Sequence, residues 1–155
     1  REVTRANMVR GSKVRRHTPS QMILGPKVLL MNEYSASDGD LFPYSFKKHD
    51  LGPTIGVRTW GGVVGIRGSL PFIDGGYMRK PEFASYSAEK SEWIIEGHGV
   101  EPDIRVENDP HEYYQGKDAQ LQKAIEVVKD RLEDFEPIPE IPEGPDKSGP
   151  DGQEE

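Results

Sequence analysis

Cysteine is absent from the 155 residues, which excludes disulfide bonds and thiolate metal sites. Long apolar runs are missing too, since none approaches the roughly 20 residues of a membrane span. No secretory signal pattern is visible. Carboxylates and histidines do not cluster at ligand spacings, and the glycines after Trp60 lack the lysine of a phosphate-binding loop. We therefore expect no metal site, no cofactor and no membrane contact.

The net charge of −7 comes from one end of the chain. Residues 134–155 hold eight acidic side chains and one lysine, whereas the remaining residues balance at 19 acidic against 19 basic. Prolines alternate with acidic residues and glycines there, so residues 136–155 are predicted to form a disordered acidic tail. Residues 1–25 carry a basic cluster without interleaved aromatics, which indicates an exposed or partner-facing irregular arm and no nucleic-acid site.

The central residues 26–135 have the pattern of an α/β domain. The apolar run 27–32 predicts a buried strand, and residues 41–49 predict a helix with Pro43 in its first turn. A final helix is expected over residues 118–135, with Asp118 as N-cap and an apolar face of four residues. That face comprises Leu121, Ile125, Val128 and Leu132. Short strands are expected between the helices, at residues 54–58, 63–67, 77–78, 82–86 and 93–95.

A serine turn between the first strand and the first helix is the most informative local pattern. Residues 32–40 read NEYSASDGD, and a serine between a strand and a helix is how a hydroxyl is lifted out of a sheet as a nucleophile. Helix-start amides next to it can stabilise an oxyanion. Both Ser35 and Ser37 could instead merely cap the helix, which serine does well.

Four segments together resemble a known family. They are NEYSASDGDLFPYSFKK at residues 32–48, LGPTIGVRTWGGVVGIRG at 51–68, IEGHGVEPDI at 95–104 and YQGKDAQL at 114–121. They closely resemble the C-terminal catalytic subdomain of the tricorn proteases, which belong to the C-terminal processing (tail-specific) serine peptidases. The resemblance covers roughly residues 25–134, and it implies part of a catalytic domain with a ClpP/crotonase-like fold.

The resemblance implies roles for five residues. Ser37 corresponds to the nucleophile, and the Asp38 backbone amide corresponds to one donor of the oxyanion hole. Glu96 corresponds to the glutamate that supports the catalytic histidine through a second serine. Gly65 and Ile66 correspond to substrate contacts, although their glycine-rich segment could equally form a bulge or tight turn between strands. Ser35 is the weaker alternative nucleophile, because it falls at the strand end.

The family's catalytic histidine and its serine partner have no counterpart in this sequence. The chain begins with Arg1 and not with methionine, so we expect an upstream segment of the parent protein to supply both residues and the second oxyanion amide. His98 is nearest to a catalytic element, but its place in the pattern is not that of the base. Taken alone, these residues are therefore expected to be inactive.

The resulting hypothesis is a serine peptidase that cleaves peptides or unfolded protein tails through an acyl-enzyme on Ser37. Homo-oligomerisation and a cytoplasmic location are expected from the resemblance, with a periplasmic or extracytoplasmic location left open. Two alternatives remain. One is a non-catalytic peptide-binding or assembly module of the same fold, and the other is a crotonase-like acyl-CoA enzyme, which the serine turn and Glu96 disfavour.

Overall fold

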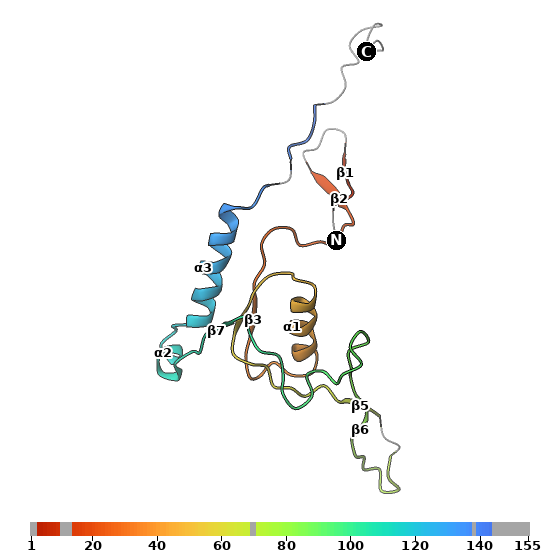
Figure 1. Cartoon of the computed structure of the whole chain (residues 1–155). Helices are drawn as coiled ribbons and strands as arrows, with labels where there is room; N and C mark the ends of the chain where they lie inside the picture. Colours follow the sequence, from red (N-terminus) through yellow and green to blue (C-terminus); the bar gives the residue numbers. More distant parts are fainter. Residues whose placement is uncertain (1–2, 10–13, 69–70, 138, 144–155) are drawn as a thin grey trace.

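A parallel three-stranded sheet lies at the centre of the structure, a computed structural model that describes residues 3–9, 14–68, 71–137 and 139–143 (Figure 1). Its strands are β3 (Leu29–Met31), β4 (Thr54–Gly56) and β7 (Ile104–Arg105), in the order β3-β4-β7. β4 is buried along its whole length, which explains why its sequence is apolar or small at each position. The expected strands at 27–32 and 54–58 are thus confirmed in shorter form.

Two helices pack against this sheet. Helix α1 (Asp38–Lys48) contacts β3, and α3 (Ala119–Glu133) contacts β3 and β4. They lie on opposite sides of β3 in Figure 1. Because α1 connects the parallel strands β3 and β4, the first half of the domain is a βαβ unit. Among the described residues, no helix has both the length and the apolar character needed to cross a bilayer.

Two antiparallel strand pairs lie outside the central sheet. β1 (Arg5–Met8) pairs with β2 (Arg15–Thr18), so the prediction of an irregular arm over residues 1–25 is wrong for these eight residues. β5 (Gly65–Arg67) pairs with β6 (Lys80–Phe83), which begins two residues before the predicted strand. The expected strand at 77–78 is absent, and that at 93–95 is reduced to one bridge, between Tyr86 and Trp93.

The helices differ from their predictions at particular positions. α1 begins at Asp38, three residues early, so Pro43 lies inside the helix and not in its first turn. The α3 N-cap is confirmed, since the Asp118 carboxylate accepts a hydrogen bond from the Leu121 amide at 2.9 Å. The short helix α2 (Pro110–Tyr114) was not predicted. Most of the predicted disordered tail, residues 138 and 144–155, lies outside the described residues.

The predicted apolar face of α3 is only partly buried. Ala124 is buried at 4% exposure, and Val127 and Val128 are half-buried. Three residues of the predicted face, in contrast, stay 45–50% exposed: Leu121, Ile125 and Leu132. The helix therefore uses its smaller side chains against the sheet and leaves its larger ones on the surface.

Asp103 fastens the start of β4 to the loop before β7. Its Oδ2 accepts hydrogen bonds of 2.8 Å from both the amide and the hydroxyl of Thr54, and its Oδ1 pairs with Lys47 at 2.8 Å. Partial burial raises the pKa of this carboxyl, but the bonds from Lys47 and Thr54 outweigh it, so the pKa lies below its ordinary value. The Asp118 pKa is also lowered, chiefly by the Leu121 amide.

These lowered pKa values predict acid sensitivity. A carboxyl whose pKa is lower in the folded chain stabilises the fold above its unfolded value, about 4, and loses this contribution as the pH falls through the folded value. The free energy of unfolding should therefore fall below about pH 4. Asp103→Asn should weaken the protein at neutral pH and flatten this decline. Denaturant unfolding from pH 2 to 7 measures both, and equal slopes in the two proteins would contradict the role of Asp103.

Candidate active site

Ser37 occupies the turn between β3 and α1, as N-cap of the helix. Its backbone has φ 56° and ψ −113°, in a region that residues with a side chain rarely adopt. Such conformations cost of order 1–3 kcal/mol and cluster at functional sites. A strained serine between a strand and a helix is also the geometry that exposes a nucleophilic hydroxyl. Ser37 is exposed, as that role needs.

The two serines of the turn are used differently. Ser37 and Asp40 have a capping-box arrangement: the Ser37 amide donates to Asp40 Oδ2 at 2.9 Å, and the Asp40 amide, which faces the Ser37 side chain, donates to the Ser37 carbonyl at 2.9 Å. Ser35 Oγ accepts a hydrogen bond from the Asn32 amide at 3.1 Å and lies 3.4 Å from Asn32 Oδ1. The Ser35 hydroxyl therefore holds the turn together, whereas the Ser37 side chain is exposed at the start of the helix.

The amide of Asp38 lies beside the Ser37 side chain. Asp38 is the first residue of α1, where helix geometry offers no intrahelical acceptor to the N–H group. The positive end of the helix dipole adds to its ability to stabilise negative charge. The chain thus places a donor one residue after the exposed hydroxyl.

Next to this turn, residues 59–64 form hydrogen bonds with residues 95–100. The Thr59 amide donates to the Val100 carbonyl at 3.0 Å, and the Val100 amide donates to Thr59 Oγ1 at 2.8 Å. The Gly97 amide donates to the Gly61 carbonyl at 2.8 Å. Gly61 has φ 89°, and a Cβ there would lie 2.4 Å from the Gly99 nitrogen, so only glycine allows this approach.

Glu96 is held by the second half of the same loop. Its Oε2 accepts hydrogen bonds from the Val63 amide at 2.7 Å and from the Val64 amide at 3.0 Å. Glu96 and Ser37 make no direct hydrogen bond with each other. Asp40 connects the two regions, because it accepts hydrogen bonds from the Ser37 amide and from the amides of Gly61 and Gly62.

None of the four histidines is arranged as a base for Ser37. The Ile95 amide donates to His98 Nε2 at 3.2 Å, so Nδ1 carries the proton and donates to the Glu96 carbonyl at 3.1 Å. His49 is the C-cap of α1, about 18 Å along the helix from its N-cap. His111 contacts Gln115, and His17 lies on β2. Over the described residues, no cluster of potential metal ligands is present either.

Gly65 and Ile66 begin β5, whose one edge is paired with β6. A Cβ at Gly65 would lie 1.8 Å from the Phe83 ring, so the packing of this aromatic side chain explains the glycine. Ile66 is 55% exposed. In the described part of the chain the other edge of β5 carries no strand, and its main-chain groups are open to a ligand in extended form.

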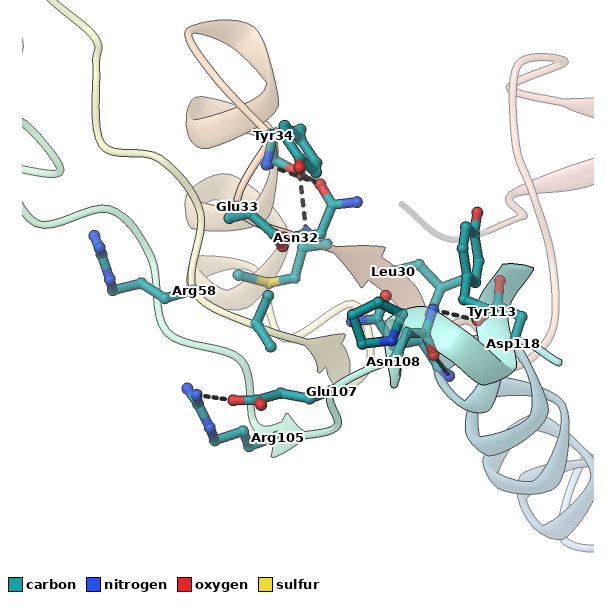
Figure 2. Close-up of a pocket in the computed structure, with 15 residues that line it drawn as sticks. Leu30, Asn32, Glu33, Tyr34, Arg58, Arg105, Glu107, Asn108, Tyr113 and Asp118 are labelled. Carbon is teal, nitrogen blue, oxygen red and sulfur yellow. Dashed lines mark hydrogen bonds and ion pairs between the residues drawn. The ribbon is translucent and has the colours of Figure 1, made fainter. Parts of the chain in front are cut away.

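A cavity of about 810 Å³ opens at the carboxyl ends of β3, β4 and β7 (Figure 2). Ser35 lines it but Ser37 does not, so the exposed hydroxyl of Ser37 is not part of the cavity wall. Arg105 and Glu107 form an ion pair in its wall, and Asn108 donates a hydrogen bond to Asp118 at 3.0 Å. The sequence alone does not predict this cavity, because its wall combines residues that are far apart in the chain, at 30–35, 57–58 and 105–120.

A strained, exposed serine with a helix-start amide beside it is an arrangement compatible with a serine nucleophile. The sequence model of Peptidase family S41 matches residues 2–106. The chain therefore belongs to Peptidase family S41.

Known relatives agree with this assignment. The chain is 42% identical over 125 residues to the tricorn protease of Thermoplasma acidophilum, and 47% identical over 116 residues to a tricorn protease homolog of Saccharolobus solfataricus. These matches cover 80% and 74% of this chain but only 12% and 11% of the relatives. A crystal structure of the tricorn protease superposes with a TM-score of 0.77 at 38% identity, covering 86% of this chain and 13% of that one. The resemblance and the α/β fold predicted from the sequence are confirmed.

The strain at Ser37 can be measured by comparing glycine with alanine. Because glycine adopts positive φ at no steric cost, Ser37→Gly should be more stable than Ser37→Ala by about 1 kcal/mol. At the exposed helical position Ser45 the order should reverse, with glycine less stable than alanine by about 1 kcal/mol. Denaturant unfolding of the four variants tests this. The same order at both positions would show that the Ser37 backbone is unstrained.

Proposed function

We propose that this chain is the nucleophile-bearing part of a serine peptidase. Ser37 attacks the scissile carbonyl, and the Asp38 amide donates to the oxyanion that forms. Glu96 supports the histidine through an intervening serine. The observation that carries the proposal is the Ser37 turn between β3 and α1, with positive φ and an exposed side chain.

The general base in this proposal comes from outside these 155 residues. A serine at its free pKa needs a base, and each histidine of the chain is tied to its own loop or lies on another element. The matched relatives are several times longer than this chain, which leaves room for a segment that bears the histidine, its serine and a second oxyanion donor. That segment would approach Glu96, whose carboxylate is exposed.

Substrates in this proposal are peptides or unfolded protein tails. An extended peptide can pair with the open edge of β5 at Gly65 and Ile66, where main-chain hydrogen bonds give affinity with little side-chain selectivity. Homo-oligomerisation also belongs to the proposal, and the exposed apolar residues of α3 support it. The proposal includes no cofactor.

Labelling with a fluorophosphonate tests the nucleophile. In the complete polypeptide that contains these residues, Ser37 should be labelled, and fluorogenic peptidyl-coumarin amides should be hydrolysed. Ser37→Ala should lower turnover by about 10⁴- to 10⁶-fold. The isolated 155 residues should be silent, and adding the rest of the polypeptide should restore hydrolysis.

Two controls separate the alternatives. Ser45→Ala, on the exposed side of α1, should leave labelling and hydrolysis unchanged. Labelling that survives Ser37→Ala would remove the nucleophile assignment. A complete polypeptide that binds peptides without hydrolysing them would favour the non-catalytic binding module.

A further inference from the structure

Asp40 is a wholly buried carboxylate with three backbone donors. Its side chain is 0% exposed, and Oδ1 accepts a hydrogen bond from the Gly61 amide at 2.8 Å. Oδ2 accepts from the Ser37 amide at 2.9 Å and from the Gly62 amide at 3.1 Å. In a capping box the side chain of the third helical residue needs only its bond to the N-cap amide, so the two glycine amides add a contact that the helix itself does not need.

A buried carboxylate is costly unless hydrogen bonds compensate for lost hydration. Here three donors do so, and the position in the first turn of α1 places the charge at the favourable end of the helix dipole. The two glycine donors lie 21 and 22 residues further along the chain. The contact is therefore long-range, and it joins the nucleophile turn to a separate loop.

The same loop holds Glu96 with its next two amides. Gly61 and Gly62 donate to Asp40, and directly after them Val63 and Val64 donate to Glu96 Oε2. Four consecutive amides thus bind two carboxylates, one beneath the nucleophile and one in the supporting position. The separation between these two carboxylates is set by the loop backbone and not by flexible side chains.

We propose that Asp40 is a positioning residue, which fixes the Ser37 turn and the Glu96 loop relative to each other. This inference rests on the proposed peptidase function. Asp40 touches no reacting atom in this account; it holds Ser37 through the Ser37 amide, and it holds the loop that binds Glu96 through the Gly61 and Gly62 amides. Because a displacement of about 1 Å can cost about 100-fold in rate, loss of Asp40 should lower kcat far more than it raises KM.

The test uses three variants of the complete polypeptide with fluorogenic peptidyl-coumarin amides. Asp40→Asn keeps the volume and one carbonyl oxygen but turns an NH2 group toward amide donors. It should lower kcat about 10- to 100-fold with KM changed less than about threefold, and Asp40→Ala should lower kcat further. Asp103→Asn is the matched control, since Asp103 also accepts backbone and side-chain hydrogen bonds but lies beside Thr54. It should lower stability and leave kcat unchanged.

A double-mutant cycle separates positioning from general loosening of the fold. If Asp40 acts through the loop that holds Glu96, the double variant Asp40→Asn/Glu96→Gln should lose less kcat than the product of the two single losses. In the double variant Asp103→Asn/Glu96→Gln, the loss of kcat should equal the product of the two single effects. If Asp40→Ala does not fold, Asp40→Asn and the double-mutant cycle still test the positioning role of Asp40. An unchanged kcat in folded Asp40→Asn, or independent effects in its cycle, would overturn the inference alone. Absence of Ser37-dependent hydrolysis in the unsubstituted protein would overturn the proposed function and this inference with it.

Discussion

The buried carboxylate of Asp40 is the contact on which the geometry of the site depends. It satisfies the amide of a residue whose backbone is strained, and it satisfies two amides of a loop from another part of the chain. Removing such an acceptor would leave buried donors without partners, at about 1–3 kcal/mol for each group. A strained turn persists only when its surroundings determine it, and here the hydrogen bond to Asp40 supplies part of that determination.

Local physics made much of the fold predictable. The apolar run before Asn32 predicted β3, the periodicity after Asp118 predicted α3, and the side chain of Asp118 caps that helix as expected. Long-range pairing was not predictable in the same way. β7 is two residues long, and it exists because Ile104 pairs with Ile55 of a distant strand. The larger residues of α3 stayed on the surface because the smaller Ala124 lies against the sheet.

In the candidate site, too, local features could be predicted from the sequence and long-range contacts could not. The position of Ser37 between β3 and α1 could be predicted because a strand, a serine and a helix follow one another in the sequence. The hydrogen bonds from the Val63 and Val64 amides to Glu96 could not be predicted. They depend on how a glycine-rich loop packs beside a segment more than thirty residues away in the sequence. The packing of the Phe83 ring against Gly65 could not be predicted either, because it depends on the pairing of β5 with β6.

The connection from β4 to β7 runs outward and back through the β5–β6 pair (Figure 1). It is closed at its base by the two hydrogen bonds between Thr59 and Val100 and further out by the β5–β6 pairing. Segments beyond such a closure can change length at small entropic cost, about 0.6 kcal/mol for each doubling of a flexible loop. The outer hairpin is thus a place where relatives can vary in length and surface chemistry while the strands that position the serine stay in register.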